Sequence, residues 1–212
     1  MKKILSLIAL FSFGTYFSTH AGTLIGWDLP VSTATNSVAP ITPLANGVVG
    51  GNMSGNTARD TTSTARWQFK NFKYTNYADA FASNTSIAFQ LGAASGYNLT
   101  INGVGVATHY RSGSGPGSIR FIFSTNSDFS TYSTIGNFDY GTNSGSTNLA
   151  PYWTSLLSNS PVTIPAGSTG YFRFVLYGTT NTNGTGGFGA GNVSPAADFS
   201  LLDRKSTRLN SS

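Results

Sequence analysis

Few residues of this chain could carry out acid, base or nucleophilic chemistry. It contains two histidines, His20 and His109, no cysteine and no glutamate, so aspartates supply all its carboxylate side chains. A Ser-His-Asp triad could form around His109, but no Gly-x-Ser-x-Gly segment is present to hold a serine nucleophile at a strand-to-helix turn. The missing cysteines exclude thiolate zinc sites and cysteine nucleophiles from this chain. We expect His109 to be a packed or rim residue of a strand.

Paired carboxylates could still cleave glycosides. The candidates are scattered along the chain, and no glutamate is present to act as the usual acid: Asp28, Asp60, Asp79, Asp128, Asp139 and Asp198. Asp128 and Asp139 lie near turns, where aspartate usually accepts hydrogen bonds from local backbone. A glycoside hydrolase or lyase is therefore the least favoured function, and we predict no enzyme and no catalytic residue.

Ligand sites for ions and phosphates are equally weak. A histidine-based metal site lacks partners, and Gly113–Gly117 and Gly184–Gly189 lack the Lys-Ser/Thr ending and following helix of a phosphate loop. Both glycine clusters are typical of turns. We predict no cofactor; calcium stays open but unassigned, because loops rich in Asp, Asn and backbone carbonyls can hold it.

Aromatic residues are the stronger candidates for binding, because exposed rings can stack on sugar rings. We expect Trp27 and Trp67 to pack in the core, since aromatic side chains supply much of a core's buried area. Five other rings could lie on a surface and form a glycan-stacking platform: Trp153, Tyr152, Tyr132, Tyr74 and Tyr77. A carbohydrate-binding module is the alternative function that these residues support.

The elements that must position these residues are predicted to be short strands, because the hydrophobic pattern between Gly22 and Leu202 has period 2. Trp67 and Phe69 should face a core, with Gln68 and Lys70 facing water. The predicted strands are Thr23–Leu29, 66–70, 87–91, Leu99–His109, 119–123, Thr131–Phe138, Tyr152–Leu157, Pro161–Ile164, Tyr171–Tyr177 and Ala197–Leu202.

Residues 171–177 are apolar on both faces apart from Arg173, which predicts a central strand covered on both sides. No window has a convincing period of 3.6 residues, although Tyr77–Ala82 could form one helical turn. The Gly/Asn/Thr-rich stretch Gly178–Gly191 is predicted to be a long exposed loop. About ten short strands without helices indicate an all-β protein, a single antiparallel β-sandwich of the jelly-roll type over residues 22–202.

Both ends differ from this domain. Residues 1–21 have two lysines, a short apolar run and Thr19-His20-Ala21 before Gly22, which is the layout of a cleaved secretory signal peptide. We therefore expect export to the cell surface or the extracellular space. Residues 203–212 match, at every position, the translation of a common sequencing adapter, so we expect them to be an artefact that truncates the native sequence after Leu202.

Three sets of motifs carry a family resemblance: Ile25-Gly26-Trp27-Asp28; Arg111–Pro116 with Ser124–Phe129; and Tyr171–Gly178 with 198–201. Together they resemble the extracellular domain of bacterial proteins with a PEP-CTERM sorting signal. The resemblance implies a non-catalytic, exported β-sandwich that is displayed at the surface or in the matrix and is associated with exopolysaccharide. An extracellular polysaccharide is the partner that it implies. Within the motif, we expect Arg111 to pair with loop carbonyls or an aspartate.

The formal net charge of +5 at first suggests an anionic partner such as nucleic acid. Two of the cations lie in the signal peptide, however, and three lie in the last ten residues. Residues 22–202 are nearly neutral, so we expect no nucleic-acid partner. No segment of this range is apolar enough to hold the chain in a membrane, so we expect no membrane span apart from the signal peptide.

Overall fold

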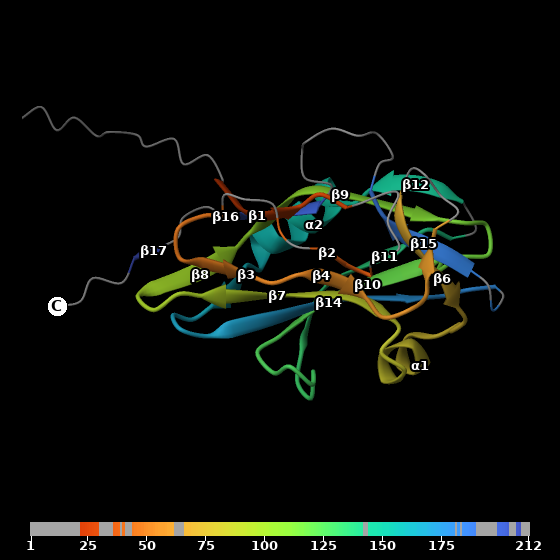
Figure 1. The fold of residues 1–212 in the computed structure, drawn as a ribbon, viewed down its shortest axis with the longest axis horizontal. Helices are drawn as coiled ribbons and strands as arrows, with labels where there is room; N and C mark the ends of the chain where they lie inside the picture. Colours follow the sequence, from red (N-terminus) through yellow and green to blue (C-terminus); the bar gives the residue numbers. More distant parts are fainter. Residues whose placement is uncertain are drawn as a thin grey trace, which may run out of the picture.

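The computed structural model describes residues 22–29, 36–38, 40, 44–61, 66–141, 144–180, 182, 184–189, 199–203 and 207–208. The predicted signal peptide, Asp198 and most of the predicted adapter tail lie outside these residues. The chain forms an all-β fold of two packed antiparallel sheets (Figure 1). The predicted sandwich of antiparallel sheets is confirmed, while the jelly-roll connectivity stays a prediction.

The first sheet has the strand order β1-β16-β9-β15-β6-β5, with β12 also paired to β9. Its strands are β1 (Gly22–Trp27), β5 (Arg59–Asp60), β6 (Trp67–Phe72), β9 (Gly103–Arg111), β12 (Gly145–Asn148), β15 (Gly184–Phe188) and β16 (Phe199–Asp203). The second sheet has the order β11-β10-β14-β7-β4-β2, with β3 paired to β7. Its strands are β2 (Ser37–Val38), β3 (Val48–Gly50), β4 (Met53–Gly55), β7 (Ser86–Ala93), β10 (Ser118–Ser124), β11 (Ser133–Asp139) and β14 (Thr169–Tyr177).

A small third sheet, β13-β8-β17, lies at one end of the sandwich. It contains β8 (Tyr97–Ile101), β13 (Val162–Ile164) and β17 (Thr207–Arg208). The predicted strand over residues 99–109 is therefore two strands, β8 and β9, which separate at Asn102. The last predicted strand, 197–202, is observed as β16, which continues to Asp203, and β17 pairs with β8.

Aromatic side chains fill the space between the two large sheets. The Phe174 ring is central, with centroids 4.4 Å from Phe121 and 4.9 Å from Phe188. Trp27 and Trp67 are fully buried, as predicted. Rings of this size remove much apolar surface from water, so this cluster stabilises the contact between the sheets.

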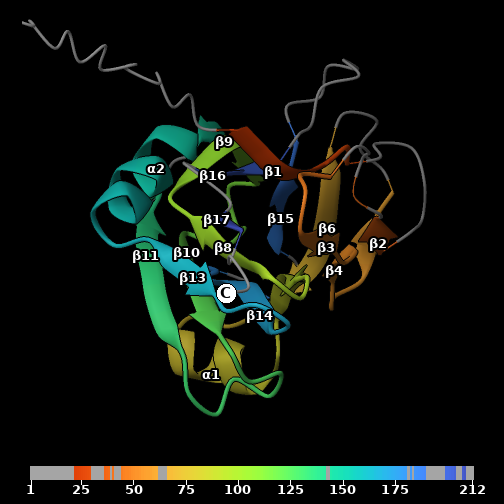
Figure 2. The same cartoon turned by 90° about the vertical axis from the view of Figure 1, so that its left-hand side faces the viewer.

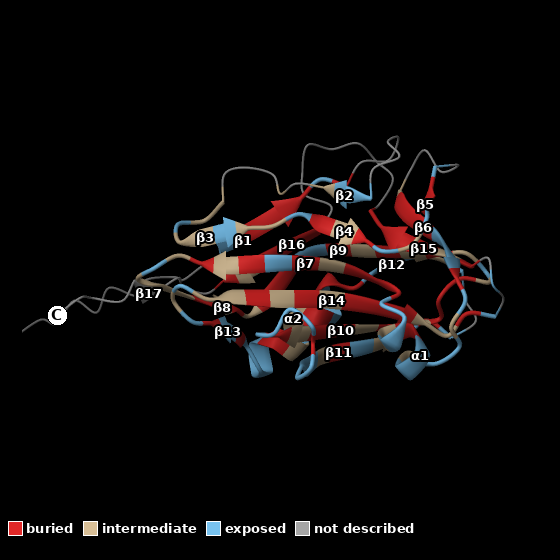
Figure 3. Cartoon of the chain, turned by 60° about the horizontal axis from the view of Figure 1, so that its bottom comes forward, coloured by how far each residue is buried: buried red, intermediate tan, exposed pale blue. Residues whose placement is uncertain are grey.

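The second sheet follows the predicted period of 2. In β7 the side chains of Ile87, Phe89 and Leu91 are buried in the core, and Gln90 between them is exposed. Figure 3 shows the same alternation of buried and more exposed residues along β7 and β14. Because successive side chains of a strand point to opposite faces, each of these strands places a second set of residues on the outer face of the sheet.

Within the described part of the chain, two helices flank the sandwich (Figure 2). The short helix α1 (Tyr77–Ala82), predicted as one turn, packs on β14 at the outer face. Its N-cap is Asn76, whose Oδ1 accepts a hydrogen bond from the Asp79 amide at 2.9 Å. Neither described helix is long and apolar enough to cross a bilayer.

The second helix, α2 (Ala150–Asn159), corrects the prediction of a strand over Tyr152–Leu157. A proline, Pro151, lies in its first turn, where the missing N–H and fixed φ favour helix initiation. Ala150, Trp153 and Leu157 are its buried residues, and their spacing places them on one helical face against the core. Sequence reasoning overlooked this pattern because the helix has only ten residues, and over so short an apolar run a period of 3.6 is hard to tell from a strand.

The predicted exposed loop over Gly178–Gly191 is also wrong in part, because Gly184–Phe188 forms β15 inside the first sheet between β9 and β6. Its glycines allow close approach of neighbouring backbone: a Cβ on Gly187 would lie 2.3 Å from the Trp67 carbonyl oxygen. The predicted turn at Gly184–Gly189 is thus mostly strand. Gln68, expected to face water, is buried and donates to an Asp60 carboxylate oxygen at 3.0 Å.

Candidate functional site

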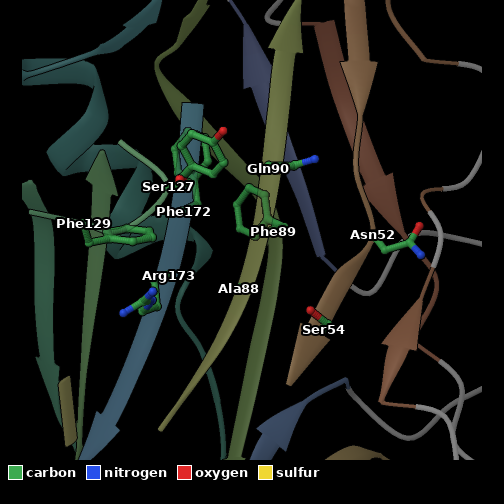
Figure 4. A pocket seen from close by; sticks show the side chains of 10 residues that line it. Asn52, Ser54, Ala88, Phe89, Gln90, Ser127, Phe129, Phe172 and Arg173 are labelled. Atoms are coloured by element: carbon green, nitrogen blue, oxygen red, sulfur yellow. The ribbon is translucent and has the colours of Figure 1, made fainter. Parts of the chain in front are cut away.

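A groove crosses the outer face of the second sheet and has a volume of about 440 Å³. Figure 4 shows its side chains coming from β4, β7, β14 and the β10–β11 loop. Its lining residues are Asn52, Ser54, Ala88, Phe89, Gln90, Ser127, Phe129, Tyr171, Phe172 and Arg173. Phe89 and Phe172 belong to the buried core, and apart from Ala88 the other lining side chains are polar or aromatic, a mixture typical of a binding site for a polar ligand.

The floor of the groove consists of two cross-strand pairs that follow one another on the outer face of the sheet, since the Phe172–Phe89 pair between them belongs to the core. Tyr171 of β14 lies opposite Gln90 of β7, and Arg173 lies opposite Ala88. On the far side of Ala88, its partner in β4 is Ser54. Adjacent strands are about 4.8 Å apart, so these pairs present a row of groups across the sheet at regular spacing.

Arg173 is the charged residue of this lining. Its Nε is buried and has no hydrogen-bond partner among the described residues. Its guanidinium carbon lies 4.0 Å from the centroid of the Phe129 ring and 5.6 Å from that of Phe81 on α1. Burial lowers the pKa of Arg173, but a guanidinium keeps its proton at neutral pH. A positive charge therefore lies at the edge of the groove, held by two aromatic rings.

The loop that carries Phe129 is fixed by its own hydrogen bonds. The backbone amide of Asn126 donates to Ser124 Oγ at 2.8 Å, and the backbone amide of Phe129 donates to the Asn126 backbone carbonyl at 3.1 Å. The Asp128 carboxylate accepts from the Ser130 amide at 2.9 Å, the local bond that we predicted, and this bond lowers the pKa of Asp128. Phe129 itself has φ +56°, a left-handed conformation that is strained for a bulky residue. The loop thus holds a strained backbone that directs this ring under Arg173.

The five predicted stacking residues do not form one platform. Trp153 is fully buried and packs 5.2 Å from Phe121, so the prediction that its ring lies on the surface is wrong. The helix α2 turns this side chain into the core, which the predicted strand did not allow for. Tyr152, also on α2, is 39% exposed, and its ring packs against Phe138 of β11 at 5.5 Å, with its hydroxyl donating to the Asn137 carbonyl.

Tyr74, Tyr77 and Tyr132 lie around α1 on the same sheet face as the groove. Tyr74 and Tyr77 are half-buried and pack against the small apolar cluster of Ala80, Ile122, Phe129 and Val175. One face of the Tyr77 ring is covered by the Arg120 guanidinium at 3.7 Å. Tyr132 is 40% exposed and lies 5.1 Å from the Phe81 ring. Of the three, Tyr132 offers the most open surface next to the groove.

Sequence reasoning missed the groove residues Tyr171, Gln90 and Arg173. The prediction that β14 is a central strand is confirmed, because it lies between β10 and β7. The expectation that both its faces are covered holds only in part. Val175 lies in the apolar cluster beneath α1, and the half-buried Tyr171 packs against that cluster and lines the groove together with Arg173. A lone arginine at an outward position of an apolar strand was the signal available.

His109 and Arg111 lie elsewhere, in β9 of the first sheet. His109 is fully buried, with its ring 5.0 Å from Tyr140 and 5.3 Å from Phe188, so it is a packed residue, as we predicted. Burial, with the nearby Arg111 charge, lowers the pKa of His109 to about 3. Arg111 donates to the carbonyls of Gly141 and Gly113 at 2.6 and 3.1 Å, which confirms its predicted pairing with loop carbonyls.

The carboxylates are dispersed. Asp60 bonds to Gln68, Asp79 lies in the first turn of α1, and Asp139 accepts from the Gly141 amide at 2.9 Å, again the predicted local bond. Asp198 lies outside the described residues. Within the described part of the chain, no three histidine, aspartate or glutamate side chains gather in a way that could hold a metal ion.

Comparisons of the chain with models of protein families, with curated proteins and with solved structures gave no match.

Proposed function

We propose that this protein is an exported, non-catalytic β-sandwich that binds extracellular polysaccharide in the groove on its second sheet. The observation that carries the proposal is the groove floor, where Tyr171 and Gln90 form a cross-strand pair beside Arg173. An aromatic ring next to amide and guanidinium donors matches the alternating apolar faces and hydroxyl groups of a sugar. The export part of the proposal rests on the layout of residues 1–21.

Binding is favoured over cleavage because of what lines the groove. Glycoside hydrolysis requires two carboxyl groups facing one cleft. The groove lining contains no carboxylate and no histidine among the described residues. Asn52, Ser54, Gln90 and Ser127 instead supply neutral donors and acceptors, which can exchange hydrogen bonds with water for hydrogen bonds with hydroxyl groups.

Affinity electrophoresis of the purified full chain through gels that contain neutral or acidic polysaccharides tests this proposal. We expect retardation by at least one polysaccharide, and loss of that retardation in Tyr171→Ala. Tyr152→Ala is the matched control, because it removes an exposed tyrosine outside the groove and should leave the retardation unchanged. Equal loss in both variants, or no retardation by any polysaccharide, would contradict the proposal.

A further inference from the structure

We propose that the groove selects anionic saccharides, and that Arg173 binds the carboxylate or sulfate ester of a sugar unit whose neighbours lie over Tyr171 and Gln90. This inference rests on the proposed polysaccharide-binding function and adds the chemical class of the ligand. It follows from the charge of the lining, from the surroundings of the guanidinium and from the neutral groups around it.

The charge in the groove is not compensated by its own lining. Among the described lining residues, Arg173 is the single ionised side chain, and the other side chains are neutral. Asp128 follows the lining residue Ser127 in the sequence, but it does not line the groove, and its carboxylate accepts the Ser130 amide hydrogen. The lining therefore presents a net positive charge to a ligand.

The surroundings of the guanidinium favour an anion over a neutral hydroxyl pair. The Phe129 ring lies at 4.0 Å and the Phe81 ring at 5.6 Å, so water has access to only part of the group. Nε is buried without a hydrogen-bond partner among the described residues. A guanidinium presents its N–H groups as a planar fork that matches a carboxylate with two parallel, charge-assisted bonds. A partly desolvated guanidinium gains more from such an anion than a fully hydrated one.

The neighbouring groups fit the rest of a sugar chain. Gln90 and Tyr171 form the pair two residues along the strands from Arg173 and Ala88, which is the next pair on the same face of the sheet. Ser54 is paired with Ala88, so it continues the row from Arg173 across the sheet. These groups are neutral and can bind the hydroxyl groups or the ring face of a sugar. Recognition of the ligand's negative charge therefore falls to Arg173.

Titration calorimetry of the full chain with an oligogalacturonate and with its methyl ester isolates the charge, because the two ligands share the same sugar ring. A sulfated oligosaccharide and its desulfated form provide the second pair, which separates the two sources of negative charge. We expect the anionic member of at least one pair to bind about tenfold or more tightly than its neutral form, as charge-assisted hydrogen bonds predict. That preference should weaken as the salt concentration rises.

Arg173→Gln should abolish the preference, and Arg173→Lys should retain part of it, since lysine keeps the charge without the fork. Thermal unfolding of both variants verifies that they fold. Equal affinity for charged and neutral members, or a preference that survives Arg173→Gln, would overturn the inference. If the charged and the neutral saccharide of a pair bind equally and Tyr171→Ala abolishes the binding of both saccharides, the inference fails while the proposed polysaccharide binding stands. If no member of either pair binds and no polysaccharide retards the chain, both fail.

Discussion

The guanidinium of Arg173 lies over the ring of Phe129, with 4.0 Å between Cζ and the ring centroid. The contact joins a central strand of the second sheet to the loop between β10 and β11, two segments that are far apart in the sequence. Nε of Arg173 is buried and lacks a hydrogen-bond partner among the described residues. The contact with the Phe129 ring is therefore what holds the guanidinium at the groove. The loop thus contacts a charged strand side chain that lines the groove.

Phe129→Leu should weaken anionic saccharide binding while the protein stays folded. Leucine keeps an apolar group in the cluster with Ala80, Ile122 and Val175, but it removes the ring that attracts the guanidinium. A cation–π contact is worth about 0.5 to 2 kcal/mol, so we expect binding to weaken by about twofold to thirtyfold. Calorimetry with the oligogalacturonate measures the loss. Unchanged affinity would mean that Phe129 does not position Arg173.

Trp153→Ala should destabilise the fold by about 3 to 5 kcal/mol, the usual cost of removing a fully buried large aromatic side chain. Trp153→Phe should cost much less, because the buried indole Nε1 has no hydrogen-bond partner among the described residues and its loss removes an unsatisfied donor. Urea unfolding of both variants measures these costs. An alanine variant of normal stability that no longer binds polysaccharide would contradict the buried position and restore the surface role.

Arg111→Ala should cost about 3 kcal/mol of unfolding free energy. The side chain is 1% exposed and donates to the carbonyls of Ser112, Gly113 and Gly141, so its removal breaks three charge-assisted hydrogen bonds. Arg111→Lys should recover little of this, since one ammonium cannot span three carbonyls in different directions. A variant with unchanged melting temperature and abolished saccharide binding would show that Arg111 belongs to a binding site instead.

His109 should make the fold less stable in mild acid. Its pKa is about 3 in the folded protein, because burial disfavours the charged ring, and near 6.5 in the unfolded chain. The unfolded state therefore binds a proton first, and stability falls as the pH decreases from 6.5 toward 3. Between pH 7 and pH 5, where most carboxylates remain ionised, the loss should be about 2 kcal/mol.

His109→Phe removes that titration and should flatten the stability profile between pH 7 and pH 5, as followed by urea unfolding at each pH. The ring should be tolerated in a site formed by Tyr140 and Phe188. If the wild-type chain and the variant lost the same stability over this range, other groups would be responsible for the acid sensitivity.

The alternation in β7 and β10 could be read directly from the sequence, because each strand has a core face of large apolar side chains that recur at every second position. The strand β15 could not be predicted from the sequence, because its glycines carry no side chain whose polarity could alternate. Their role depends on the proximity of β6, where the Trp67 carbonyl would clash with any Cβ on Gly187. That contact is long-range, so no local pattern encodes it.

The candidate site, like the fold, has one part that the sequence could indicate and another that depends on long-range contacts. The tyrosines of the sequence predicted exposed rings, and Tyr132 beside α1 is 40% exposed. The groove itself arises from cross-strand neighbours, Tyr171 with Gln90 and Arg173 with Ala88. Register between strands that are about eighty residues apart in the sequence depends on the whole sheet, so the sequence indicated Arg173 only as an exception in an apolar strand.

The central claim is that an anionic sugar binds at Arg173, and an NMR titration of the full chain with oligogalacturonate tests it most directly. The resonance to follow is the Nε–Hε of Arg173, assigned by its loss in Arg173→Lys. We predict that it shifts in step with the backbone amides of Gln90 and Tyr171, and that the methyl ester leaves it nearly unchanged. Shifts confined to residues outside the groove, such as those around Tyr152, with the Arg173 resonance unmoved, would contradict the claim.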